Sequence, residues 1–285
     1  MKVVRGVAEA RAAAAGLRAS AGALAFVPTL GALHAGHAAL VARARELARG
    51  VALSVFVNPL QFGPAEDFAA YPRDPAGDAA RAEGWGVDLF FAPAAEELTP
   101  AGMAVTVDPG PLAAELEGAT RPTHFRGVLT IVAKLLHIVT PDVAVFGQKD
   151  LQQLVLVRRM VRDLGLDVRI AAVPTVREPD GLALSSRNAY LSPAERAAAP
   201  GLFRALRAGE RAVAEGERDP ARVAAAVRSA LAASPALVVD YVAVRRADDL
   251  AEVPEIEGPT ALAAAARVGR TRLIDNLIVT PGTLS

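Results

Sequence analysis

Hydrophobic residues gather in short runs that alternate with longer stretches in which they recur every three or four positions. Short apolar runs are typical of strands buried in a parallel sheet, and the longer periodic stretches are typical of amphipathic helices. The predicted strands are residues 24–28, 51–57, 87–91, 143–146 and 167–173. The predicted helices are residues 5–19, 38–48, 75–83, 125–139 and 151–164. This alternation predicts an α/β fold whose parallel sheet is covered on both faces.

The pattern changes after Pro174, where strands and helices stop alternating singly. Glu178-Pro179-Asp180-Gly181 is a strong turn signal. A smaller α+β unit is predicted beyond it, with helices at 193–215 and 219–233 and strands at 237–245, 262–267 and 272–279. We place the domain boundary near residues 180–188, which gives a first domain of residues 1–183 and a C-terminal domain of residues 184–285 that closes over the site.

The composition indicates a protein with a large apolar core and no membrane or secretory segment. Hydrophobic residues make up 52% and charged residues 22% of the chain, and no apolar run reaches the length that spans a bilayer. The N-terminus lacks the apolar core of a signal peptide, and cysteine is absent, so we expect a cytoplasmic protein without disulfides. The formal net charge is zero, so a nucleic-acid partner is not expected.

Candidate chemistry centres on the segment Pro28–His37, which follows the first long predicted strand. His34 and His37 are three positions apart at a predicted helix start, so both imidazoles point the same way. Unpaired N–H groups and the positive end of the helix dipole favour a phosphate at such a turn. Gly36 has no side chain, so a flat ligand such as adenine could pack there. From these residues alone, a metal site and an ordinary helix start remain open alternatives.

Lysine usage draws attention to a second turn. Only three of the 31 basic residues are lysines, namely Lys2, Lys134 and Lys149. A lysine kept inside a motif therefore indicates a need for a compact ammonium group. Lys149 follows a predicted strand, as do the two histidines and Gln61. Because ligands of open parallel sheets bind beyond the carboxyl ends of strands, we expect one crevice to hold all of them.

Several motifs, taken together, resemble the pantoate–β-alanine ligase family, which belongs to the nucleotidyltransferase superfamily with a HIGH motif, here His34-Ala35-Gly36-His37. They occur in the order of that family and span about residues 26 to 191. The motifs are Pro28–His37, Val57–Gly63, Tyr71-Pro72-Arg73, His124-Phe125-Arg126-Gly127, Gly147-Gln148-Lys149-Asp150 with Gln152-Gln153, and Leu184-Ser185-Ser186-Arg187-Asn188. The resemblance is weaker beyond residue 191.

The resemblance implies a Rossmann-like doubly wound parallel sheet with a smaller C-terminal α+β domain. It also implies a two-step ligation in which the carboxylate of pantoate attacks the α-phosphate of ATP and the amine of β-alanine then attacks the resulting pantoyl adenylate. The products are pantothenate, AMP and pyrophosphate. Mg²⁺ accompanies the ATP, and the family is typically a cytoplasmic homodimer.

The resemblance also assigns roles to single residues. His34, His37 and Lys149 would stabilise the reacting phosphates, with His37 at the position taken as a proton donor. Gln61 and Gln153 would hold pantoate, since an amide orients a carboxylate without the strong pairing of an arginine. Asp78 matches an aspartate associated with Mg²⁺, although a solvated helix residue is an equal alternative. The expected nucleotide-binding residues are Leu30, Gly31, Ala32, Leu33, His34, Ala35, Gly36, His37, Gly147, Gln148, Lys149, Asp150, Val176, Leu184, Ser185, Ser186 and Arg187.

The chain departs from the family pattern at four positions. Leu30 and Leu184 replace methionines of similar volume, Gln148 replaces a frequent glutamate, and His137 replaces a frequent asparagine and is given no role. Rival readings are another nucleotidyl-transferring enzyme, such as a cytidylyltransferase, an aminoacyl-tRNA synthetase, and a nucleotide-binding regulatory module without catalysis. The glutamine pair argues against the first, the short C-terminal unit and neutral charge against the second, and the intact histidines and Lys149 against the third.

Overall fold

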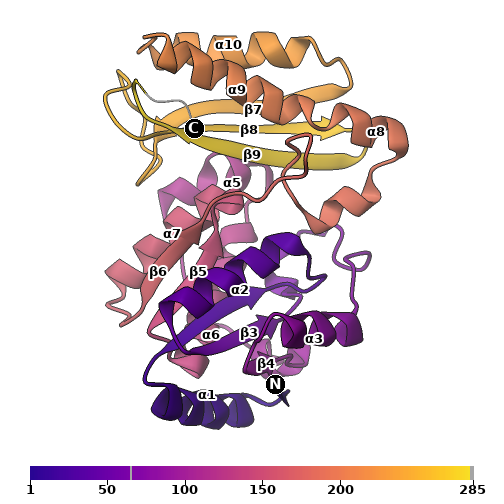
Figure 1. Ribbon diagram of the computed structural model, residues 1–285, viewed down its shortest axis with the longest axis vertical. Helices are drawn as coiled ribbons and strands as arrows, with labels where there is room; N and C mark the ends of the chain where they lie inside the picture. The colour runs from indigo at the N-terminus through magenta and orange to yellow at the C-terminus, as the bar shows by residue number, and fades with distance from the viewer. Residues whose placement is uncertain (65, 283–285) are drawn as a thin grey trace. The chain divides into compact units, whose positions relative to one another are not determined.

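The computed structural model describes residues 1–64 and 66–282 (Figure 1). Contacts divide the chain into two compact units. Unit 1 consists of Met1–Gly147 and Leu156–Pro174, and unit 2 consists of Gln148–Val155 and the chain from Thr175 onward. The domain boundary placed between residues 183 and 184 stays a prediction.

Unit 1 is built on a parallel sheet of six strands in the order β1-β4-β3-β2-β5-β6. The strands are β1 (Lys2–Val4), β2 (Leu24–Thr29), β3 (Gly50–Val55), β4 (Leu89–Phe91), β5 (Val143–Gly147) and β6 (Arg169–Val173). From β2 the chain winds outward to β3 and β4 on one side and, later, to β5 and β6 on the other, so the fold is doubly wound with a switch point between β2 and β5. The predicted α/β class is confirmed. The short edge strand β1 was not predicted, because three residues carry no detectable periodicity.

The helices of unit 1 cover both faces of this sheet. Residues of α2 (Ala35–Leu47) and α3 (Pro75–Gly84) share a core with Ala25 and Val27 of β2. Because side chains alternate along a strand, Leu24 and Phe26 face the opposite side, where α1 (Val7–Ala21) and α6 (His124–Val139) pack against each other and against β2. The short elements of this unit are η1 (Pro59–Gln61), α4 (Ala95–Leu98), η2 (Pro111–Ala114) and α5 (Glu117–Thr120).

Helix α6 confirms the helix predicted at residues 125–139. It is strongly apolar, and twelve of its 16 residues are buried. A helix of that length is about 24 Å long, which is shorter than the roughly 30 Å of a bilayer core. The apolar side chains of α6 are therefore part of the hydrophobic core of unit 1. Among the described residues, no helix has both the length and the hydropathy that crossing a membrane requires.

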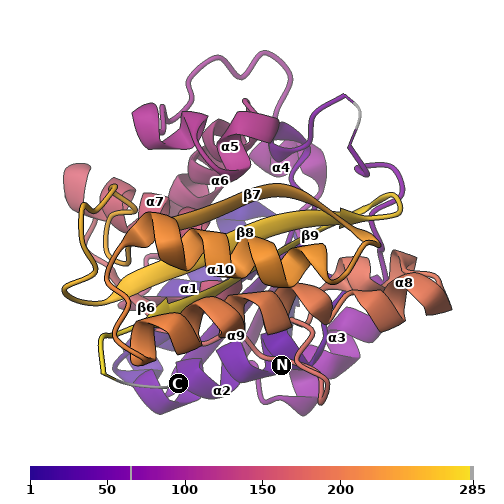
Figure 2. The ribbon, with the colours of Figure 1, turned by 90° about the horizontal axis from the view of Figure 1, so that it is seen from above.

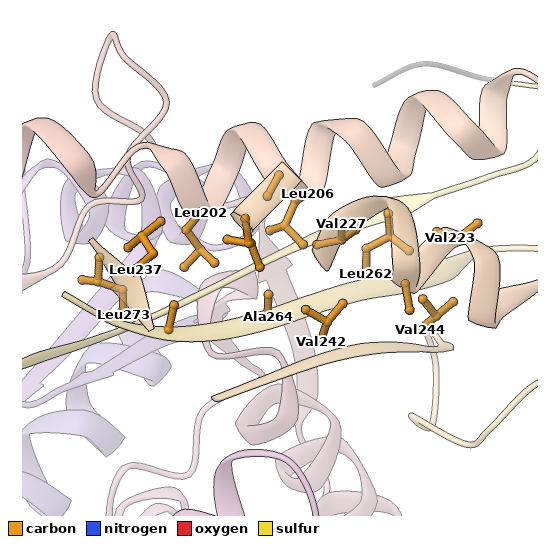
Figure 3. Close-up of a cluster of buried hydrophobic side chains, with 14 of the residues drawn as sticks. Leu202, Leu206, Val223, Val227, Leu237, Val242, Val244, Leu262, Ala264 and Leu273 are labelled. Atoms are coloured by element: carbon orange, nitrogen blue, oxygen red, sulfur yellow. The ribbon is translucent and has the colours of Figure 1, made fainter. Parts of the chain in front are cut away.

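Unit 2 is a two-layer α+β structure. Its antiparallel sheet has the order β7-β8-β9, with β7 (Leu237–Arg246), β8 (Thr260–Val268) and β9 (Thr271–Val279). Helices α9 (Gly201–Ala214) and α10 (Pro220–Ala232) lie side by side across one face of it (Figure 2). The core side chains labelled in Figure 3 come from both layers: Leu202, Leu206, Val223 and Val227 from the helices, and Leu237, Val242, Val244, Leu262, Ala264 and Leu273 from the strand side.

The single helix predicted for residues 193–215 is wrong, because the structure has two helices there. Helix α8 (Pro193–Ala198) ends before Pro200, and α9 begins directly after it. Proline has no N–H and its ring collides with the preceding turn, so a helix does not run through it unbroken. The remaining elements are η3 (Gln148–Asp150), α7 (Leu151–Asp163), which begins in unit 2 and ends in unit 1, and η4 (Ser186–Tyr190).

Candidate functional site

The two histidines lie against each other at the start of α2. The Nδ1 of His34 accepts a hydrogen bond from the N–H of Gly36 at 3.1 Å, and the Nδ1 of His37 accepts from the N–H of His34 at 3.2 Å. The ring centroids are 4.2 Å apart. Because each Nδ1 is an acceptor, each Nε2 carries the ring hydrogen, and the pair offers two N–H donors from one turn. The helix begins at Ala35, earlier than predicted, because the histidine rings cap it.

The backbone before His34 makes a tight turn that requires glycine at one position. Gly31 has φ +88°, and a Cβ there would lie 2.7 Å from the side chain of Val55. Ala32, the next residue, is also in the left-handed region at φ +49°. The next two N–H groups, those of Ala32 and Leu33, point to one side of the turn. Such a conformation is costly and needs outside support.

Asp78, on α3, supplies that support from inside the protein. Its Oδ2 accepts from the N–H of Ala32 at 2.9 Å and its Oδ1 accepts from the N–H of Leu33 at 2.7 Å. The side chain is only 1% exposed, so neither hydrogen bond competes with bulk water. The carboxylate therefore holds the turn in place before the two histidines.

Helix α3 is itself fixed by charge. Asp74 caps its N-terminus, with Oδ1 accepting from the N–H of Gly77 at 3.0 Å. That hydrogen bond, together with the Arg81 guanidinium, lowers the pKa of Asp74 below its ordinary value. Arg81 also lies 3.6 Å from Asp78, so the buried carboxylate has a positive neighbour. The cap by Asp74 and the charge of Arg81 together hold Asp78 in position beneath the turn.

The geometry does not favour Asp78 as a direct magnesium ligand. Both of its oxygens already accept backbone N–H groups in a nearly closed environment. Within residues 1–64 and 66–282, no group of three or more His, Cys, Asp or Glu side chains is placed to hold a metal ion. Mg²⁺ commonly keeps several waters and binds through substrate phosphates, which needs no such cage. The magnesium role of Asp78 stays a prediction.

Gln61 lies at the end of η1, beyond β3, and is held on both its side chain and its backbone. The Nδ2 of Asn58 donates to Gln61 Oε1 at 3.0 Å. The carbonyl oxygen of Gln61 accepts from Arg121 at 3.3 Å and lies 3.0 Å from the Nδ1 of His124. With Oε1 engaged by Asn58, the Nε2 donors of Gln61 point away from that partner. Gln61 is therefore presented as a fixed amide donor.

The network behind Gln61 was missed at the level of sequence. Arg121 donates to Nε2 of the buried His124, so the ring hydrogen lies on Nδ1 and is donated to Gln61. Glu66 accepts two hydrogen bonds from Arg121, at 2.6 and 2.8 Å. The motif His124-Phe125-Arg126-Gly127 was a signal for this network, but its spacing does not say what His124 contacts.

Gly127 lets helix α6 approach η1 closely. A Cβ on Gly127 would lie 2.2 Å from the carbonyl oxygen of Leu60 and 2.6 Å from the nitrogen of Gln61. The carbonyl of Gly127 also accepts from Asn58 at 3.1 Å. Both contacts are to backbone, which cannot move aside like a flexible side chain. The position of Gln61 thus depends on a glycine in a different helix.

In unit 2, the predicted Lys149 site is the turn η3. The Nδ2 of Asn276 donates to the carbonyl oxygens of Gln148 and Lys149, each at 3.0 Å. The ammonium of Lys149 lies 3.8 Å from the Asp150 carboxylate, and its side chain is 20% exposed. Gln153, half-buried, follows one turn later on α7. The lysine can reach a ligand while its backbone is held.

The other predicted residues of unit 2 come together around a hairpin-like turn at 178–181. Leu184 donates from its N–H to the carbonyl of Val176 at 2.9 Å, so two predicted nucleotide-binding residues lie opposite each other. Ser185 caps the N-terminus of η4, where its Oγ accepts from the N–H of Arg187 at 3.3 Å. Val176, Leu184 and the Ser185–Arg187 segment therefore belong to one local structure.

Each unit thus gathers part of the predicted set. Unit 1 holds residues 30–37, Asp78, Gln61 and Gly147, and unit 2 holds residues 148–150, Gln153, Val176 and 184–187. A single crevice that contains both groups remains a prediction from the strand ends. Their roles in binding and catalysis are treated below as proposals.

Comparison with known proteins gives a consistent result. The family model described as pantoate-beta-alanine ligase matches residues 2–278. A pantothenate synthetase of Chloroflexus aggregans is 53% identical over 281 residues, which is 98% of this chain and 100% of that protein. The crystal structure of pantothenate synthetase from Thermus thermophilus superposes with a TM-score of 0.93 at 50% identity, covering 99% of this chain and 100% of that one.

A third similar protein was solved with ligands. It is the pantoate-beta-alanine ligase from Francisella tularensis, described as complexed with beta-gamma ATP and beta-alanine. Its TM-score is 0.80 at 30% identity, and the match covers 98% of this chain and 97% of that one. The similarity to all three proteins extends over nearly the whole chain, including unit 2.

The first prediction concerns Asp78→Asn. The amide would place an NH₂ group against one of two backbone N–H groups, so we expect a loss of about 1–3 kcal/mol in the free energy of unfolding. Hydrogen exchange at Ala32 and Leu33 should accelerate. Asp88→Asn is the control, because Asp88 accepts from Val51 at 2.9 Å, away from the turn. Unchanged exchange combined with an altered Mg²⁺ requirement would instead favour a metal role.

A second prediction concerns Gly127→Ala. The new methyl group meets the backbone of Leu60 and Gln61, so we expect a loss of about 1–3 kcal/mol in denaturant unfolding. Gly16→Ala is a matched control in helix α1, because a Cβ there meets nothing within 4 Å. That control should be neutral or stabilising by about 0.5–1 kcal/mol. Equal stability of the two variants would mean that the approach of α6 to η1 is not required.

Proposed function

Because the chain belongs to the pantoate–β-alanine ligase family, we propose that it joins (R)-pantoate to β-alanine at the expense of ATP, with pantothenate, AMP and pyrophosphate as products. The observation that carries the proposal is the family match over residues 2–278. The paired histidines at the start of α2 support it, because both rings lie at a helix N-terminus, where the helix dipole favours a phosphate.

The first step forms a pantoyl adenylate. An oxygen of the pantoate carboxylate attacks the α-phosphorus of ATP, and the bond between that phosphorus and the β-phosphate oxygen breaks to release pyrophosphate. Negative charge shifts onto phosphate oxygens in the transition state. The Nε2–H groups of His34 and His37 and the helix dipole of α2 stabilise that charge.

Lys149 contributes a mobile positive charge. Its long stem lets the ammonium follow the phosphates as the leaving group departs, which the rigid fork of arginine does less well. Ser185, Ser186 and Arg187 act from the loop that begins η4 and close on the phosphates. The nucleotide-binding residues named from the sequence complete this site.

Gln61 and Gln153 hold pantoate. An amide donor orients the carboxylate by a hydrogen bond and leaves its charge largely available for attack. Arginine at either position would form a bidentate ion pair and weaken the nucleophile. The fixed orientation of Gln61, imposed by Asn58, His124 and Arg121, supports this role.

In the second step, the neutral amine of β-alanine attacks the acyl carbon of the adenylate. The bond between that carbon and the phosphate oxygen breaks and AMP leaves. The amine nitrogen passes one proton to the departing phosphate or to solvent as the amide forms. Mg²⁺ bound to the phosphates of ATP would supply charge neutralisation there. We also propose a cytoplasmic location and a homodimer, as the family resemblance implies.

A third prediction tests the order of the steps. With ATP, Mg²⁺ and pantoate but no β-alanine, the enzyme should catalyse exchange of labelled pyrophosphate into ATP. Gln153→Ala should weaken the exchange by misplacing the carboxylate, since reacting atoms must lie within about 3–3.5 Å. ATP binding should change little. Exchange that needs β-alanine, or that proceeds equally well without pantoate, would contradict an adenylate intermediate.

A fourth prediction concerns Lys149→Ala. Loss of one strong transition-state donor should lower the pyrophosphate exchange rate by roughly 10²–10³-fold. The thermal unfolding midpoint should stay near that of the parent chain, because the lysine is in a short turn. Lys2→Ala, at an exposed position of β1, is the matched control and should keep full activity. Normal turnover in Lys149→Ala would remove the lysine from the mechanism.

A further inference from the structure

One side chain of β9 holds the turn that carries Lys149. Asn276 is buried and lies more than a hundred residues beyond the turn in sequence. Its Nδ2 donates to the carbonyl oxygens of both Gln148 and Lys149 at 3.0 Å. Its Oδ1 accepts from Gln148 Nε2 at 3.3 Å. The two amide donors and the amide acceptor are all directed at one turn of three residues.

Only a primary amide can make this set of contacts. Aspartate has the same shape but would direct oxygen at two carbonyl oxygens, and leucine or alanine would offer no hydrogen bond. The carbonyl groups of Gln148 and Lys149 are part-buried, and without the amide of Asn276 each would lose a donor, so the turn would be held less firmly. The identity of Asn276 is therefore matched to the backbone of Gln148 and Lys149.

Asn276 is itself held in place by an ion pair between Arg177 and Asp275. Arg177 donates to the two oxygens of Asp275 at 2.6 and 2.9 Å, and to the backbone carbonyl of Asn276 at 3.3 Å. The guanidinium lies 3.9 Å from the centre of the Phe203 ring, which packs against its face. Burial raises the pKa of Asp275, and Arg177 opposes that shift. The pair fixes the segment of β9 from which Asn276 projects.

We propose that Asn276 is a positioning residue for Lys149, acting through the backbone of residues 148 and 149, and that Arg177 and Asp275 hold it in register. The inference rests on the proposed role of Lys149 in adenylate formation. A flexible lysine acts at the right place only if its Cα is fixed, and a displacement of about 1 Å can reduce a rate by about 10²-fold. Asn276 itself touches no reacting atom.

The test is a double-mutant cycle between Asn276 and Lys149. The kcat of each variant is measured by pyrophosphate exchange in the presence of pantoate. We expect Asn276→Ala and the isosteric Asn276→Asp each to lower kcat by about 10–10²-fold. In the Lys149→Ala background, the same changes should lower kcat less than about threefold, because residues that act through one group are not additive. Asn276→Asp retains the shape of the side chain and covers the case in which the alanine variant fails to fold.

Leu273→Ala controls for general loss of stability. Leu273 is a buried core residue of the same strand and makes no contact assigned to the turn. We expect it to lower the unfolding midpoint while kcat stays within about twofold of the parent value. Three outcomes would each overturn the proposal. The first is that the Asn276 changes lower kcat equally in the parent chain and in Lys149→Ala. The second is that the Asn276 variants keep the parent kcat, and the third is that Leu273→Ala loses as much kcat as they do.

The outcome separates this inference from the proposed function. If the parent chain shows no pantoate-dependent exchange, the proposed function fails. If the parent chain is active and Lys149→Ala is slow, but the Asn276 variants behave like the parent, then only the positioning role fails.

Discussion

The buried carboxylate of Asp78 is the interaction on which the histidine site depends. It is a strong acceptor placed under two backbone N–H groups that point the same way because Gly31 and Ala32 both have positive φ. Without that acceptor the turn would expose two unpaired donors in a nearly dry environment, which is unfavourable. The start of α2, and with it the direction of both imidazoles, follows from the turn. A charge in one helix thereby sets the geometry of another.

The same physical arrangement occurs three times in the protein. Each of the three candidate site segments follows the end of a parallel strand, where backbone groups are no longer paired by the sheet. A buried polar side chain from a distant element then satisfies those groups: Asp78 for residues 32 and 33, His124 for Gln61, and Asn276 for residues 148 and 149. The parallel sheet determines where the three segments lie, and these buried side chains fix the conformation of each segment. At the turn before His34, where Gly31 and Ala32 have positive φ, the backbone strain is thus compensated locally.

The sequence was informative where the signal is periodic or repeated. Apolar runs predicted β2, β3 and β5 within a few residues, and the motif set identified the family because several weak signals agreed. The supports of the site escaped prediction because a side chain that bonds to a distant backbone leaves no spacing pattern. Asp78 was assigned by resemblance to a metal, Asn276 received no role, and His124 was quoted only as part of a motif. Pro200, by contrast, is visible in the sequence. The helical periodicity of apolar residues continues on both sides of it, and the prediction followed that periodicity rather than the proline.

The hydrogen bonds of the two histidines constrain the chemistry that they can perform. Each Nδ1 accepts a backbone N–H, so a second ring proton would have to be placed on a nitrogen that faces a donor. While both caps are made, each ring has its hydrogen on Nε2. A neutral imidazole that gave up that hydrogen would become an imidazolate, which is far too basic to form readily beside phosphates. The pair is therefore suited to donate hydrogen bonds to developing negative charge rather than to transfer a proton, and electrostatic stabilisation of this kind needs no reorganisation as the reaction proceeds.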